Sequence, residues 1–223
     1  MQNTKACFFA AILCIALLAL CACGSPAAPE ETTAPTIKTP TLPIQYPASY
    51  KAAPEAYWPV LNDLLKFVCL IRDDSWDSID MLYGSTGIVE TPGAFSDDGF
   101  LHNLGYAIQD INNDGVPELL LLAKDGFMLS LFTLRSDDKP VLLDSYSVRS
   151  HANLAADGEI SVLSFTGTGR FLSSYILRKD AIKLTLLTEF FELYMTEEDF
   201  HALCEAHYNP PNLMKLDFIS IEQ

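Results

Sequence analysis

Apolar residues recur at helical spacing directly after residue 54. They lie three or four positions apart and form one stripe: Tyr57, Val60, Leu61, Leu64, Val68 and Ile71. Polar residues such as Asp63 and Lys66 fall on the opposite side, so the pattern predicts an amphipathic helix. Pro59 is tolerated in the first turn of this helix, because a backbone N–H there would have no hydrogen-bond partner within the helix. A second, short helix is expected over residues 75–83, with Gly84 to end it.

From residue 104 onward, short apolar runs alternate with turn residues. We expect strands over residues 104–109, 118–123, 127–134, 141–148, 159–165, 171–177 and 182–190. Several links between them are short and explicit turns, such as Asp157-Gly158 and Lys179-Asp180. Because such links join antiparallel neighbours, this half of the chain is predicted to be a β-meander.

The last predicted helix has clear sequence signals at both ends. Thr196 is the expected N-cap, with Asp199 in the capping-box position, and Asn209-Pro210-Pro211 ends the helix. The inward face is expected to hold Phe200, Leu203, Cys204 and His207. Residues 216–221 are expected to add an edge strand. The predicted fold class is α+β, with N-terminal helix or helices and a C-terminal helix packed on an antiparallel β-meander.

The start of the chain resembles a bacterial lipoprotein signal. Lys5 precedes an apolar run over residues 8–23, which is shorter than the roughly 20 residues of a membrane-spanning helix. Ala22 is the small residue that the signal requires before the modified cysteine. The resemblance implies that residues 1–22 are removed and that Cys23 carries a diacylglycerol (and palmitate-type acyl chains) at the cell membrane. An ordinary secretory signal and an uncleaved anchor remain the alternatives.

Residues 23–54 have the composition of a tether. They contain seven of the 13 prolines, together with Thr, Ala and Ser and few large apolar residues. Such a segment buries too little surface to offset its ordering entropy, so we expect an extended disordered spacer. Tyr50, near its end, is a candidate to pack on the folded part. Residues 55–223 are long enough for a single domain with its own core.

Charge and cysteine positions narrow the possible partners. With 14 basic and 29 acidic residues the net charge is −15, which argues against nucleic acid as a partner. Of six cysteines, only Cys69 and Cys204 lie beyond the signal and the lipidation position. Either one disulfide or two free thiols fits the sequence, and free thiols are favoured.

One motif carries recognisable chemistry, the stretch from residue 110 to residue 118. Oxygen-bearing side chains stand at positions 1, 3, 5 and 9, namely Asp110, Asn112, Asp114 and Glu118. Gly115 at position 6 allows a sharp turn, and the carbonyl of Val116 is placed for position 7. Hard oxygen ligands without His or Cys select Ca²⁺, so these five residues form a candidate structural calcium site.

The motif is not a standard EF-hand, because Leu121 occupies position 12 and Pro117 prevents a following helix. It resembles the DxDxDGxxD calcium loops of FG-GAP repeats, with Glu118 in place of the final aspartate. The longer stretch 105–119 resembles a loop of uncharacterised secreted lipoproteins of Gram-positive gut bacteria, a likeness that brings no activity. The competing interpretation is an ordinary turn at Asn113-Asp114-Gly115, which would not require Asp110.

Three kinds of function are compatible with this sequence. The first is a membrane-tethered extracytoplasmic domain with a structural calcium ion that binds an envelope protein or glycan. The second is an envelope hydrolase whose site assembles only in three dimensions, and the third is a structural or assembly factor. No recognisable catalytic set is present, for example G-x-S-x-G or H-E-x-x-H, which favours a binding protein over an enzyme.

Overall fold

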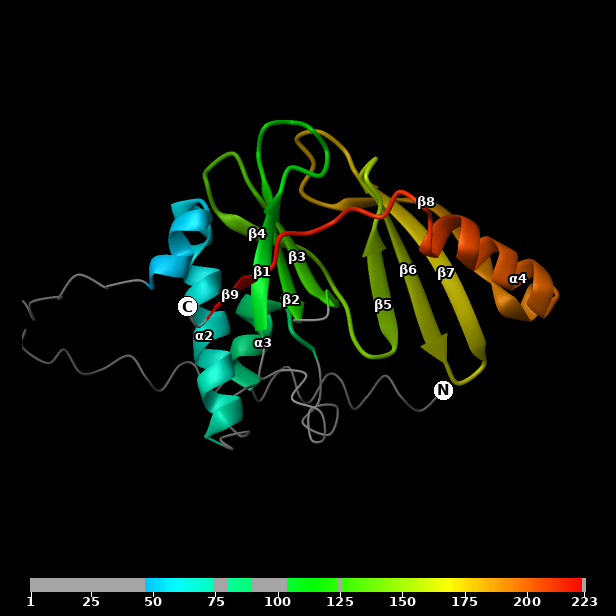
Figure 1. Cartoon of the computed structure of the whole chain (residues 1–223), viewed down its shortest axis with the longest axis horizontal. Helices are drawn as coiled ribbons and strands as arrows, with labels where there is room; N and C mark the ends of the chain where they lie inside the picture. The colour runs from blue at the N-terminus through cyan, green and yellow to red at the C-terminus, as the bar shows by residue number, and fades with distance from the viewer. Residues whose placement is uncertain (1–46, 74–79, 90–103, 124–125, 222–223) are drawn as a thin grey trace, which may run out of the picture. The chain divides into compact units, whose positions relative to one another are not determined.

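The computed structural model describes residues 47–73, 80–89, 104–123 and 126–221, all within one compact unit that spans residues 44–223 (Figure 1). Its helical elements are η1 (Ala48–Ala52), η2 (Glu55–Tyr57), α2 (Trp58–Arg72), α3 (Asp80–Thr86), η6 (Glu192–Tyr194), α4 (Glu197–Leu203) and the π-helical η7 (Cys204–Tyr208). Its strands are β1 (Leu104–Gln109), β2 (Glu118–Ala123), β3 (Met128–Leu134), β4 (Pro140–Ser145), β5 (Ser150–Leu154), β6 (Glu159–Thr166), β7 (Gly169–Leu177), β8 (Leu184–Phe191) and β9 (Ile219–Ser220).

The fold class is α+β, as predicted, but the strands form two antiparallel sheets rather than one meander. Sheet A has the order β4-β3-β2-β1-β9, and sheet B has the order β5-β6-β7-β8. The turn residues between strands are alike in both sheets. The point at which the chain passes from sheet A to sheet B therefore depends on packing. The sequence pattern did not reveal this point.

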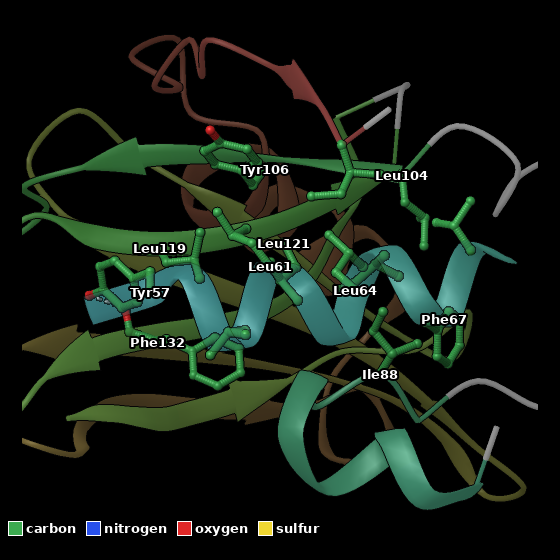
Figure 2. Packing of buried hydrophobic residues seen from close by; sticks show 14 of the residues in the cluster. Tyr57, Leu61, Leu64, Phe67, Ile88, Leu104, Tyr106, Leu119, Leu121 and Phe132 are labelled. Atoms are coloured by element: carbon green, nitrogen blue, oxygen red, sulfur yellow. Dashed lines mark hydrogen bonds between the residues drawn. The ribbon is translucent and has the colours of Figure 1, made fainter. Parts of the chain in front are cut away.

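Helix α2 packs on one face of sheet A (Figure 2). Leu61, Leu64 and Phe67 project from the helix and are fully buried. They meet Tyr106 and Leu119 on the neighbouring strands β1 and β2. The predicted apolar stripe is confirmed, and its burial against sheet A fixes the position of α2 on the sheet.

Strand β2 is buried along its whole length because both faces of sheet A are covered. Leu119 and Leu121 point into the core shared with α2, whereas Leu120 and Leu122 point into a second core. That second core is completed by residues of sheet B, including Ile160. The continuous run of leucines therefore belongs to the central strand of a layered unit.

Sheet B is covered on its other side by the last helical turns (Figure 1). Phe200 is fully buried there, with the Arg170 guanidinium 5.1 Å from its ring centroid. The side-chain amide of Asn153 donates to the carbonyl of Tyr208 at 2.8 Å. The predicted N-cap is confirmed, since the hydroxyl oxygen of Thr196 accepts the N–H of Asp199 at 3.1 Å.

Several elements differ from the sequence-based prediction, and the edge strand expected over residues 216–221 is the two-residue β9. Helix α3 continues past Gly84 and ends before Gly87, whose positive φ of 67° and N–H bond to the Tyr83 carbonyl close the last turn. The part of that predicted helix over residues 75–79 lies outside the described residues. Strand β5 was not predicted, because its sequence Ser-His-Ala-Asn-Leu has little apolar character.

The packed part of the chain begins before residue 55. Tyr50 in η1 is fully buried, and the hydroxyl of Tyr106 donates to the carbonyl of Ser49. The end of the segment predicted to be a tether thus joins the core. Cys69 and Cys204 are free thiols in the structure. None of the helices among the described residues has the length and apolar character needed to cross a membrane.

Candidate functional site

The candidate loop connects β1 to the central strand β2 of sheet A. β1 ends at Gln109 and β2 begins at Glu118, and these two residues pair across the strands. Gly115 has a φ of 90° and Asn113 a φ of 55°. Both lie in the left-handed region that Gly and Asn tolerate best. The sharp turn predicted around position 6 is therefore present.

The side-chain oxygens at positions 1, 3 and 5 converge on the same few backbone amides. The two carboxylate oxygens of Asp110 accept the N–H groups of Asp114, at 3.1 Å, and of Gly115, at 2.9 Å. The amide oxygen of Asn112 also accepts the Asp114 N–H, at 3.0 Å. The Asp114 carboxylate in turn accepts the N–H of Val116 at 2.8 Å. These bonds wind the loop tightly around its own oxygens.

Glu118 is fully buried beneath this loop. One carboxylate oxygen accepts the Ile111 N–H at 2.9 Å, and the other accepts the hydroxyl of Thr133 at 2.9 Å. Burial raises the pKa of Glu118 to about 7, although these two bonds oppose the rise, and the charges of Asp114 and Asp110 add to it. No basic side chain among the described residues forms an ion pair with this carboxylate.

Asp114 has a different electrostatic environment. Burial alone raises its pKa, but N–H groups of Val116 and Asp180, the Asn112 amide and the charge of Lys179 together hold that pKa below its usual value. Asp114 is therefore ionised throughout the physiological range. Its second oxygen accepts the Asp180 N–H at 3.3 Å, which links the loop to the turn between β7 and β8.

The loop sits where the layers of the unit meet. The side-chain amide of Asn112 donates to the carbonyl of Arg178, in sheet B's last turn, at 3.3 Å. Ile111 is buried in the core between the sheets, and its carbonyl oxygen lies 2.3 Å from where a Cβ on Gly158 would stand. From the other side, the Tyr57 hydroxyl of η2 donates to the Pro117 carbonyl at 3.0 Å.

The structure places the side chains of the predicted calcium ligands as follows. Asp110, Asn112 and Asp114 are brought together, whereas Glu118 is turned toward Ile111 and Thr133. Among the described residues, the structure forms no cluster of three acidic, His or Cys side chains that could by itself hold a metal ion. These oxygens remain suitable ligands for a metal ion, because a carboxylate oxygen that accepts one hydrogen bond keeps a second lone pair.

A groove of about 610 Å³ opens beside the loop. Residues 114–117 form one wall, and the remaining walls come from residues 133–136 with Asp138, from residues 180–182 and from Pro54. Three chain reversals therefore surround it, those between β1 and β2, β3 and β4, and β7 and β8. The volume lies within the range of about 300–1,000 Å³ typical of ligand sites.

The sequence pattern does not single out the groove residues that lie outside the loop. Asp138 and Asp180 are placed by turns, each with a φ of 57°. Together with Asn113 they are the described non-glycine residues with positive φ, and all three lie in the chain reversals around the groove. Asp residues in turns are common, so only the packing of the two sheets reveals that these turns come together.

His201 and Cys204, two residues whose side chains can act as a base or a nucleophile, lie outside the groove lining. Cys23 lies outside the described residues. His201 is exposed and approaches Glu205 at 3.9 Å, while Cys204 is half-buried and burial raises the pKa of its thiol. A raised thiol pKa disfavours the nucleophilic thiolate.

No protein-family model, curated protein or solved structure matches the chain, so no relative supplies a function for it.

Proposed function

We propose that this chain is a lipid-anchored extracytoplasmic binding protein whose 110–118 loop holds a structural calcium ion beside a ligand groove. The anchor rests on the signal-like start and on Cys23. The single observation that carries the binding role is the groove itself, because one of its walls is the calcium loop. An ion there would set the shape of the wall by ordering residues 114–117.

The calcium assignment is supported by unbalanced negative charge. Asp110, Asp114 and Glu118 lie close enough for the first two to raise the pKa of the third. We assign Asp110, Asn112, Asp114 and the carbonyl of Val116 as ligands, with Glu118 adding charge from its buried position, directly or through water. A divalent cation at this point would lower the repulsion among three carboxylates. Its role would be to hold the two sheets and η2 together.

Binding is better supported than hydrolysis. A general acid needs a raised pKa and access to its substrate. Asp114 lines the groove, but its pKa is lowered. Glu118 has a raised pKa, but it is fully buried, is hydrogen-bonded to Thr133 and does not line the groove. Envelope proteins and glycans are the partner classes that the proposed location makes available.

The calcium assignment is tested by thermal unfolding of the chain without its first 23 residues, which keeps the whole compact unit of residues 44–223. A site with a Kd of about 10⁻⁴–10⁻³ M would raise Tm by roughly 3–10 °C in about 10 mM CaCl₂ relative to EDTA. Asp114→Ala should abolish this calcium-dependent rise.

Asp157→Ala is the matched control for that variant. Asp157 also accepts the N–H of the residue two positions on, Glu159, at 3.2 Å, but it lies in the β5–β6 turn outside the loop. The Asp157→Ala variant should have a slightly lower Tm and should keep the full calcium-dependent rise in Tm. Equal melting of the unsubstituted chain in calcium and EDTA, or an undiminished response in Asp114→Ala, would contradict the assignment.

A further inference from the structure

We infer that the groove beside the 110–118 loop takes an extended peptide segment that carries lysine or arginine between apolar residues. This inference rests on the proposed binding function and names its ligand class. It follows from the groove's charge, its apolar surface and the kinds of side chain that line it.

The acidic side of the groove has carboxylates available for a ligand. Asp138 and Asp180 both line it, and neither forms an ion pair with another described residue. Asp114 lies in the same lining but is assigned to the calcium ion, so Asp138 and Asp180 are the carboxylates left for a ligand. A cation placed between the β3–β4 and β7–β8 turns would therefore face negative charge from two directions.

The groove's own basic residue does not cancel this charge. The guanidinium of Arg135 makes two hydrogen bonds to the Asp137 carboxylate, at 2.8 and 2.7 Å, and Lys139 approaches the same carboxylate at 3.3 Å. Arg135 is therefore already paired with a residue outside the lining. Among the lining residues, three carboxylates stand against one guanidinium, so the lining itself favours cations over anions.

The remaining lining is mostly apolar and not aromatic, with Thr133 and Ser136 as its uncharged polar residues. Its apolar residues include Val116, Pro117, Leu134, Ala181 and Ile182, and Ile182 is 49% exposed. None of the described lining residues is Phe, Tyr or Trp. Aliphatic walls suit the stems of Lys and Arg and small apolar neighbours, whereas sugar rings usually stack on aromatic rings. A peptide with alternating apolar and basic residues matches both surfaces.

The test uses fluorescence anisotropy with the chain without its first 23 residues and a labelled peptide, Gly-Val-Lys-Val-Lys-Val-Gly. The comparison peptide carries norleucine in place of both lysines. The lysine peptide should bind at least about tenfold more tightly, and its affinity should fall severalfold when NaCl rises from about 50 to about 300 mM. Equal binding of the two peptides, or no binding of either, overturns the inference.

Variants locate the binding to the groove. Asp138→Asn and Asp180→Asn should each lower the affinity for the lysine peptide by about two- to fivefold and leave the affinity for the norleucine peptide unchanged. Ile182→Ala should weaken both peptides. Glu198→Gln, an exposed charge change on α4 outside the groove, is the matched control and should change neither. If it matches the Asp variants, the effect is net charge alone and the inference fails.

Competition separates the ligand classes. Unlabelled peptide should displace the probe, whereas n-butylamine and chitotetraose should not displace it at the same concentration. Displacement by the amine would assign the groove to small cations, and displacement by the oligosaccharide to glycans. Either result overturns the peptide inference.

Parallel measurements in calcium and EDTA distinguish the two proposals. A calcium-dependent Tm rise without peptide binding removes only the peptide inference. Lysine-specific binding without any calcium effect removes the calcium assignment and leaves the groove's ligand class standing.

Discussion

Glu118 is the residue whose burial has the most direct energetic consequence. Its carboxyl group is fully buried, with Thr133 and the Ile111 N–H as hydrogen-bond partners and no cationic partner among the described residues. Desolvation of the charged form raises its pKa to about 7, whereas an unfolded chain ionises the same group near its usual value. The folded chain therefore binds a proton that the unfolded chain releases.

This difference predicts a pH dependence in the absence of calcium. Between about pH 4.5 and pH 7 the folded state binds more protons than the unfolded state, so the contribution of Glu118 to stability falls as pH rises. The loss is of the order of 1–3 kcal/mol, since one pKa unit corresponds to about 1.4 kcal/mol. Glu118→Gln should flatten this decline in urea unfolding measured in EDTA across that range. A decline of the same size in the variant would show that other groups cause it.

Gly158 is a second residue at which local geometry governs the site. It has a φ of 85°, and an added Cβ would stand 2.3 Å from the Ile111 carbonyl oxygen. Gly158→Ala should lower the free energy of unfolding by about 2 kcal/mol or more, because both the φ and the contact are unfavourable. Gly126→Ala is the matched control, with a similar φ of 88° and open space around it. Urea unfolding of the two variants separates the contact from the backbone strain; equal losses would exclude the contact.

At the scale of elements, β2 and α4 show two different origins of stability. β2 is held by burial on both faces, so its stability depends on the layers around it. α4 is short, with Phe200 as its buried residue. Helices of this length are marginal on their own. Its N-terminal hydrogen bonds therefore matter more than they would in a long helix.

The cap of α4 gives a prediction at this scale. Thr196 accepts the Asp199 N–H and donates to the Asp199 carboxylate at 2.7 Å. Thr196→Ala should cost about 1 kcal/mol and speed amide hydrogen exchange in the helix 197–203. Thr188→Ala, at an exposed position of β8, should leave that exchange unchanged. Unaltered exchange in Thr196→Ala would mean that packing of Phe200 alone orders the helix.

At the scale of the whole molecule, two sheets share a core and the 110–118 loop lies at their junction. The loop contacts η2 through Pro117, and the last turn of sheet B through Asn112 and Asp114. A cation bound there would act on the packing of both sheets at once. The proposed lipid anchor would present this junction outside the cell.

The anchor is tested by mass spectrometry of protein expressed in a bacterium that processes lipoproteins. The first tryptic peptide should begin at Cys23 and carry the mass of a diacylglycerol, because cleavage before Cys23 makes its α-amino group the new N-terminus and the lipid is attached to its thiol. Cys23→Ser should lose both the lipid mass and this cleavage, while Cys21→Ser should keep them. An unmodified terminus, or equal loss in both variants, would contradict lipidation at Cys23.

Some elements could be predicted from the sequence and others could not. The strands 104–109 and 118–123 were predicted to the residue, because each apolar run is bounded by polar or turn residues. The stripe of α2 and the cap of α4 were also predicted, since both depend on residues a few positions apart. Strand β5 was missed, because its pairing with β6 rather than its own composition makes it a strand.

The local order of residues by itself determined most of the helices and strands, several of the turns and the convergence of Asp110, Asn112 and Asp114, because these depend on backbone preferences and short-range hydrogen bonds. Only the tertiary structure decided that the strands divide into two sheets, that Glu118 turns inward to Thr133, and that Asp138 and Asp180 face a common groove. Those outcomes join segments far apart in the chain. They are selected by the burial of whole faces against one another, which no local pattern specifies.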